Sequence, residues 1–319
     1  MYEKFFYLKE KPFHITPDPK FLYLSKKHSE AIDILSFGIK ERKGFILLTG
    51  EVGTGKTTVC RALLEKMPKN TGTALILNPV LSEHDLIKTI TADFGIKVES
   101  GSVKEHLDRL NEFLLKKASS GGTSVVIIDE AQNLNTATLE MIRLLSNLET
   151  EKEKLLQIIL VGQPELRDKL GLPELRQLNQ RIIVRYHLNP LDGAETKAYI
   201  QNRLTVAGGT GNIDFKDQAL SLVFDKSHGI PRMINIICDR ALTAAFIAEK
   251  RVIDIQILRS ALEDLLKEGY LEPSEEALVP VAGRVYKNYI PHMALVFLIA
   301  LIAGFYLGPE VYKATAGIP

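Results

Sequence analysis

Eight residues, Gly50 to Thr57, follow the pattern G-x-x-x-x-G-K-[ST], a spacing that suits the binding of a nucleoside triphosphate. A triphosphate must be wrapped by backbone N–H groups at the start of a helix, and only glycine lets the chain approach it that closely. In such a loop Lys56 would reach the β- and γ-phosphates, and the Thr57 hydroxyl would take one coordination position on Mg²⁺. We expect nucleotide contacts from the following residues: Gly50, Glu51, Val52, Gly53, Thr54, Gly55, Lys56, Thr57 and Thr58.

A second chemical feature is a pair of acids, Asp129 and Glu130, that ends the apolar run Val125–Ile128. In a protein with a phosphate-binding loop, the carboxyl end of such a strand faces the bound nucleotide. Asp129 would hold Mg²⁺, directly or through water, and Glu130 would orient and polarise the attacking water. The sequence therefore predicts a metal site made by Thr57 and Asp129, and a hydrolytic role for Glu130.

Polar and basic side chains that could complete a phosphoryl-transfer site follow further along the chain. Gln163 ends the apolar run Ile158–Gly162, and a neutral amide there could sense the γ-phosphate or hold the nucleophilic water. A planar guanidinium from a neighbouring subunit or domain can stabilise charge on the transferred group. Spacing alone does not choose among the candidates for that role: Arg167, Arg176, Arg181, Arg185 and Arg232.

The elements that must position these residues alternate between apolar, strand-like runs and helix-like segments, the pattern of a parallel sheet covered on both faces. The predicted strands are Phe45–Thr49, Thr73–Asn78, Ser124–Asp129, Gln157–Gly162 and Ile182–Leu188. After Pro190 no strand is predicted, and the segments that read as helices are Gly193–Ala207, Asp217–Ser227, Arg232–Glu249 and Ile255–Glu268. We therefore predict an α/β fold, with a P-loop parallel-sheet domain over residues 1–190 and an all-helical lid domain over residues 191–268.

Composition limits the classes of partner and compartment. The chain has 319 residues, of which 45% are apolar and 25% are charged, as in an ordinary globular protein. Its 40 basic and 39 acidic residues leave a formal charge of +1, so the composition does not favour nucleic acid as a partner. Cys60 and Cys238 lie in apolar surroundings and match no metal spacing, which predicts buried free thiols in a reducing compartment.

One segment has the composition of a membrane span. Ile290–Leu307 holds eighteen residues without a formal charge, the short end of what crosses a hydrocarbon core of ~30 Å. Arg284 and Lys287 precede it, so the positive-inside tendency puts the N-terminal side in the cytoplasm. We expect a linker at residues 269–289, a single transmembrane helix in the inner membrane, and a short extracytoplasmic tail at residues 308–319.

The order of these motifs resembles that of an AAA+ ATPase: a phosphate loop, a strand ending in Asp-Glu, a polar strand end, and a helical lid with Gly-Ile-Pro-Arg. More narrowly, the chain is similar to the ExeA, or general secretion pathway protein A, family over about residues 1–307. The segments that carry this likeness are Lys11–Pro19 with Phe21 and Tyr23, Gly50–Thr58, Ile128–Gln132, Gly162–Leu166 and Leu178–Ile182. The expected arrangement of a cytoplasmic ATPase followed by one transmembrane helix is similar too.

The resemblance implies a site for ATP and Mg²⁺ and a role for each matching residue. The implied roles are Walker A contacts for Lys56 and Thr57, Walker B contacts for Asp129 and Glu130, sensor 1 for Gln163, a trans-acting arginine finger for Arg181, and sensor 2 for Arg232. Arg176 and Arg185 remain rivals of Arg181 for the finger. Asn78 is expected to act as a switch that holds the catalytic acid off line until a partner binds, and the segment before His28 is expected to pack near the adenine.

The resemblance also implies a function. It implies a membrane-anchored enzyme that hydrolyses ATP between the subunits of a homo-oligomeric ring or partial ring. The cycle would assemble or energise a cell-envelope machine of the type II secretion, pilus, or exopolysaccharide and exosortase type. Family members that assist type II secretion typically carry a periplasmic peptidoglycan-binding domain beyond the membrane helix, whereas we expect only a short tail here. The expectation is therefore either a truncated chain or a branch that works with pili or exopolysaccharide systems.

Two other classes of function share parts of this pattern. A nucleotide-dependent DNA-binding protein of the TniB or MuB target-selector type has much of the same layout, but the near-neutral charge and the expected membrane helix argue against it. An ATP-gated scaffold would use nucleotide to order the lid for partner binding, with incidental hydrolysis. Partner binding would then differ between the wild type and Lys56→Ala.

Overall fold

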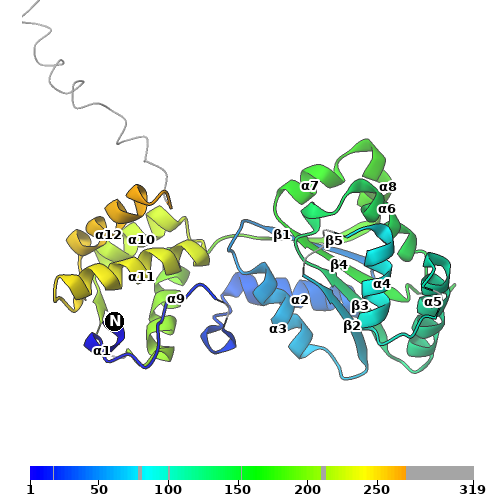
Figure 1. The fold of residues 1–319 in the computed structure, drawn as a ribbon, viewed down its shortest axis with the longest axis horizontal. Coiled ribbons are helices and arrows are strands. Elements are labelled where there is room, and N and C mark those ends of the chain that lie inside the picture. The colour runs from blue at the N-terminus through cyan, green and yellow to red at the C-terminus, as the bar shows by residue number, and fades with distance from the viewer. Residues whose placement is uncertain (17, 78–80, 100, 152, 210–212, 271–319) are drawn as a thin grey trace, which may run out of the picture. The chain divides into compact units, whose positions relative to one another are not determined.

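Five parallel strands form the central sheet of the computed structural model, in the order β2-β3-β4-β1-β5 (Figure 1). Their bounds are β1 (Phe45–Gly50), β2 (Thr71–Ile76), β3 (Thr123–Ile128), β4 (Leu156–Gly162) and β5 (Ile182–Leu188). Every residue of β1 and β4 is buried, as expected of central strands covered on both faces. The predicted parallel sheet is confirmed. The strand β3 starts and ends one residue earlier than predicted. The strand β2 starts and ends two residues early, because the first three residues of this edge strand are not buried and carry no apolar signal.

The structure describes residues 1–270 apart from 17, 78–80, 100, 152 and 210–212. Met1–Leu262 form one unit and Glu263–Pro319 another. The predicted transmembrane helix Ile290–Leu307, most of the predicted linker, the predicted tail and Asn78 all lie outside the described residues. Across the part of the chain that is described, no helix is both long and apolar enough to cross a membrane.

Alternation of side chains along the strands divides the core into two clusters, one on each face of the sheet. Ile46 and Leu48 of β1 pack with α2 (Lys26–Lys40) and α3 (Lys56–Lys66). Phe45 and Leu47 pack on the opposite face. The helices on that face are α4 (Glu83–Asp93), α5 (Val103–Ser119), α6 (Thr136–Leu145), α7 (Glu165–Leu170) and α8 (Arg176–Arg181), with the turns η2 (Ala131–Asn133) and η3 (Pro173–Leu175) (Figure 1).

Four helices follow the sheet: α9 (Gly193–Val206), α10 (Asp217–Ser227), α11 (Pro231–Ile247) and α12 (Ile255–Lys267). A capping box between Asp192 and Glu195 begins α9 and fixes where the first of them starts. Between the helices, β6 (Asp214–Phe215) pairs in parallel with β7 (Val252–Ile253). The prediction that no strand follows Pro190 is therefore wrong for these two elements, since two residues are too few to show a period.

The segment before α2 is held against the lid helices. In α1 (Tyr2–Phe5), the Phe5 ring meets the Phe246 ring of α11 edge-on, with centroids 5.6 Å apart. Further on, the buried Arg203 of α9 donates hydrogen bonds to the carbonyls of Pro12 and His14. The Arg203 guanidinium also lies 4.8 Å from the ring centroid of Phe21, in the turn η1 (Pro19–Phe21). One arginine thus fixes the path by which the N-terminal segment reaches the sheet.

Candidate nucleotide site

The phosphate loop connects the end of β1 to the start of α3, and its glycines are required by close contacts. Gly55 has a φ of +101°, and a Cβ added there would lie 2.7 Å from Nε2 of His28. A Cβ at Gly50 would lie 2.7 Å from the Leu188 carbonyl oxygen. The helix α3 begins at Lys56. The loop therefore presents bare backbone at a helix N-terminus, the arrangement that binds phosphate.

Lys56 carries its charge inside the loop. Its side chain is buried, and Nζ donates to the carbonyl oxygens of Gly50 at 2.8 Å and Glu51 at 3.0 Å. Burial lowers the pKa of Lys56 below its ordinary value, and the nearby carboxylates of Glu130 and Asp129 oppose that shift. No ion pair of this ammonium occurs among the described residues. A cation that bonds only to carbonyls is well suited to an incoming anion.

Thr57 and Asp129, the two predicted metal ligands, lie in contact. The Thr57 hydroxyl donates to Oδ2 of Asp129 at 2.6 Å, and the Asp129 side chain is buried. A hydroxyl and a carboxylate form a partial oxygen set of the kind that binds Mg²⁺ when phosphates and water supply the remaining ligands. Within the described residues, no group of three or more His, Cys, Asp or Glu side chains could hold a metal ion. The donor set thus fits a magnesium ion shared with phosphate.

Glu130 lines a cavity beside the phosphate loop and is held by two amide side chains. Nε2 of Gln163 donates to Oε2 of Glu130 at 3.2 Å, and Nε2 of Gln132 donates to the same oxygen at 2.5 Å. The structure thus brings Gln163 together with the predicted catalytic acid. In the sequence Gln132 stands out only as the last residue of the motif Ile128–Gln132, which does not predict its contact with Glu130.

A cavity of about 610 Å³ opens beside the phosphate loop, within the unit Met1–Leu262. Its walls come from three parts of the chain: the N-terminal segment with Ile15, Phe21 and Tyr23; the phosphate loop with Lys56 and Thr57; and the lid helices with Tyr199, Arg203, Arg232 and Asn235. Such a volume suits a small-molecule ligand. The N-terminal segment therefore lies beside the phosphate loop, and its expected packing near the adenine stays a prediction.

His28 is a further residue of this region, and the sequence pattern does not predict a role for it. Nε2 lies 3.0 Å from the carbonyl oxygen of Thr54, and Nδ1 lies 2.8 Å from Oγ of Ser25. Burial lowers the pKa of His28, so the ring is neutral and donates from Nε2 to the loop. The only sequence signal was the position of His28 three residues after the N-cap Ser25, which alone does not indicate a loop contact.

The start of α11 contacts the phosphate loop. The backbone N–H of Arg232 donates to the carbonyl oxygen of Gly53 at 3.3 Å, and the Arg232 side chain lines the cavity. Just before it, Gly229 has a φ of +71°, and a Cβ there would lie 1.9 Å from the Leu191 carbonyl oxygen. In return, the Leu191 N–H donates to the Gly229 carbonyl at 2.9 Å. The predicted sensor 2 residue is thus positioned by a glycine that packs on the chain leaving the sheet.

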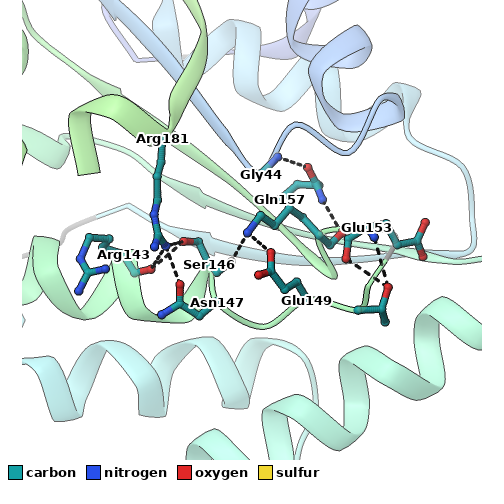
Figure 2. A network of polar contacts seen from close by, with 10 residues as sticks. Gly44, Arg143, Ser146, Asn147, Glu149, Glu153, Gln157 and Arg181 are labelled. Carbon is teal, nitrogen blue, oxygen red and sulfur yellow. Dashed lines mark hydrogen bonds and ion pairs between the residues drawn. The ribbon is translucent and has the colours of Figure 1, made fainter. Parts of the chain in front are cut away.

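Arg181 is engaged within its own chain (Figure 2). Its Nη1 donates to the Arg143 carbonyl at 3.1 Å, to Oγ of Ser146 at 2.6 Å and to Oδ1 of Asn147 at 2.7 Å. These acceptors lie at the C-terminal end of α6. From there the polar network continues as far as Gln157, which accepts from the Gly44 N–H at 2.8 Å (Figure 2). Arg181 therefore caps a helix end in this structure.

The two rival arginines differ from Arg181 and from each other. Nη2 of Arg185 donates to the carbonyl and the side-chain oxygen of Asn179, at 2.7 and 2.6 Å. Arg176 is exposed, and its guanidinium makes no hydrogen bond or ion pair among the described residues. None of the three arginines lines the cavity of its own chain.

The fold and the site together define a P-loop domain of the AAA type, and residues 39–170 match the protein family described as an AAA domain. Among solved structures, Cdc6p of Pyrobaculum aerophilum is similar with a TM-score of 0.62 at 18% identity, over 83% of this chain and 74% of that one. The ORC2 protein of Aeropyrum pernix, in its ADPNP-ADP complexes, gives a TM-score of 0.58 at 15% identity, over 80% and 71%. At such identities the likeness shows the fold alone, and an AAA+ fold implies nucleotide binding at this loop.

The sequence itself places the chain more narrowly. It is 51% identical over 247 residues to general secretion pathway protein A of Aeromonas hydrophila, a match that covers 77% of this chain and 45% of that protein. The predicted resemblance to this family of AAA+ ATPases is therefore confirmed, and the chain is a relative of general secretion pathway protein A. It spans less than half the length of the curated relatives it matches.

Proposed function

We propose that the chain binds ATP with Mg²⁺ and hydrolyses it as a membrane-anchored AAA+ ATPase of the cell envelope. The observation that supports hydrolysis most directly is the meeting of Lys56, Thr57, Asp129 and Glu130 at the phosphate loop and its cavity. Attack of water on the γ-phosphate is helped by a side chain that orients the water and accepts its proton. Glu130 is a carboxylate that lines the cavity where this water would lie.

Each residue has a distinct role in this proposal. The backbone from Gly50 to Thr58 and the Lys56 ammonium bind the phosphates, while Thr57 and Asp129 hold Mg²⁺. When bound, the ion neutralises charge on the phosphate oxygens. Glu130 accepts hydrogen bonds from the attacking water, Gln163 serves as sensor 1, and Arg232 reaches the nucleotide from the lid as sensor 2.

An arginine from a neighbouring subunit completes the site, so that activity requires a homo-oligomeric ring or partial ring. The absence of Arg176, Arg181 and Arg185 from the cavity lining of their own chain supports a contribution in trans. Arg181 matches the family motif, but it would have to leave three acceptors of its own chain to act as the finger. Arg176 makes no such contacts among the described residues and is its main rival.

The proposed organisation follows the sequence. The ATPase domain (residues 1–190) and the lid (191–268) lie in the cytoplasm, the linker (269–289) leads to one helix in the inner membrane (290–307), and residues 308–319 follow on the extracytoplasmic side. The name of the relative, general secretion pathway protein A, supports service to an envelope machine. Type II secretion, pilus and exopolysaccharide or exosortase systems all remain within this proposal.

The proposal is tested by ATP binding and hydrolysis in paired variants. Lys56→Ala removes the buried ammonium, and Lys66→Ala removes an exposed one at the other end of the same helix. We expect the first variant to lose ATP binding and turnover and the second to retain both. An equimolar mixture of Arg181→Ala with Glu130→Gln, each strongly impaired alone, should regain part of the wild-type rate if sites are shared. A salt-sensitive shift of DNA mobility with no ATP turnover would instead favour a DNA-binding switch.

A further inference from the structure

The loop after Glu130 carries a second amide, Gln132, that joins the two strand ends of the site. Its Nε2 donates to Oε2 of Glu130 at 2.5 Å, and its Oε1 accepts from the backbone N–H of Gln163 at 3.2 Å. A Cβ at Gly162 would lie 2.7 Å from that same Oε1, so the glycine makes room for the amide. Both polar atoms of the Gln132 amide are therefore hydrogen-bonded, and its N–H donates to the carboxylate of Glu130.

The two amides that contact Glu130 donate to the same carboxylate oxygen, and the other oxygen accepts no hydrogen bond from the described residues. Gln132 and Gln163 both donate to Oε2, and the other oxygen is Oε1. Glu130 also lines the nucleotide cavity. A carboxylate tied through one oxygen has a fixed plane and keeps its second oxygen as an acceptor for water.

The loop that carries Gln132 is itself held in place. Nζ of Lys169, on α7, donates to the carbonyl oxygens of Gln132 at 2.7 Å and Leu134 at 2.5 Å. Glu130 has a φ of +52°, a conformation that residues with a Cβ seldom adopt and that surrounding contacts must maintain. The contacts of Lys169 and Gln132 supply that support from two sides.

We propose that Gln132 is a positioning residue for hydrolysis: it orients the Glu130 carboxylate so that Oε1 accepts the attacking water. Lys169 acts one step behind it by fixing the loop backbone. This inference rests on the proposed ATPase function. It assigns Gln132 no contact with nucleotide, so its loss lowers turnover and leaves ATP binding intact.

The test compares kcat and ATP affinity in two variants of Gln132. Gln132→Ala removes the donor, and Gln132→Glu keeps the size but places a second carboxylate against Glu130. We expect kcat to fall about 10- to 100-fold in each, the range for groups that orient a reactive side chain, with the dissociation constant for a fluorescent ATP analogue changed less than about threefold. Gln218→Ala and Gln218→Glu, on the exposed start of α10, are the matched controls and should retain the wild-type rate.

A double-mutant cycle with Glu130→Gln separates positioning from general damage to the fold. If Gln132 acts through Glu130, then Gln132→Ala lowers the residual rate of Glu130→Gln by less than about twofold. A further loss of tenfold or more in that background would overturn the inference, as would an unchanged kcat in both single variants or an ATP affinity that falls in step with kcat. An inactive wild type would overturn the proposed function and this inference together, whereas an active wild type with unaffected variants would overturn the inference alone.

Discussion

Gly229 offers a sharp test of how the lid is joined to the phosphate loop. Gly229 has a φ of +71°, and an added Cβ would lie 1.9 Å from the Leu191 carbonyl oxygen. Each of these two features independently destabilises the folded state of Gly229→Ala. A left-handed conformation costs a residue with a Cβ about 1–2 kcal/mol. The collision is with backbone, which has no rotamer to escape into, so a shift of structure adds about 1–3 kcal/mol. We expect the free energy of unfolding to fall by about 2–5 kcal/mol in total.

The matched control is Gly121→Ala. Gly121 has a φ of +73°, but an added Cβ there meets nothing within 4 Å, so only the conformational part of the penalty applies. Urea unfolding of both variants and the wild type isolates the collision as the difference between them. Because Gly229 precedes the contact between Arg232 and Gly53, we also expect weaker binding of an ATP analogue in Gly229→Ala alone. Equal unfolding midpoints for the two variants, with equal ATP affinity, would refute the reasoning.

Two further predictions follow from the polar contacts. Arg181→Ala removes the donor to the end of α6 and should lower the free energy of unfolding by about 1–3 kcal/mol. The control Arg176→Ala should change the free energy of unfolding by less than about 0.5 kcal/mol. Identical urea midpoints for the two variants would contradict the capping role. Because the pKa of His28 is lowered in the folded chain, the unfolded chain takes up the proton first as the pH falls through about 6.5. Stability is thus retained above that pH and lost below it, and this loss should shrink in His28→Gln. An equal pH dependence of the unfolding midpoint in both proteins would contradict the burial of a neutral ring.

The sequence predicted the sheet well because its central strands are buried on both faces. In β1 and β4 the runs Phe45–Leu48 and Ile158–Val161 are continuously apolar, so the bounds of both strands could be predicted within one residue. The edge strand β2 was displaced because burial begins only at Ala74. The strands β6 and β7 were missed because two residues show no period.

The site was predictable where a motif fixes spacing and not where tertiary contacts decide. The expected metal ligands, Thr57 and Asp129, were named from two motifs 72 residues apart and do meet. His28 and Gln132 could not be recognised, because their roles arise from partners that only the folded chain brings near. The sequence alone also does not reveal that Arg181, at the end of α8, caps the helix α6, because the acceptors lie more than 30 positions earlier in the chain.

The most direct test of the account is the ATP turnover per subunit of the whole chain, measured against protein concentration with and without Mg²⁺, beside Glu130→Gln. The account predicts turnover that requires Mg²⁺ and rises with concentration as shared sites assemble. It also predicts that Glu130→Gln binds ATP with wild-type affinity and hydrolyses it at least about 100-fold more slowly than the wild type. A wild type that binds ATP but shows no turnover at any concentration, with Glu130→Gln changing nothing, would contradict the central claim.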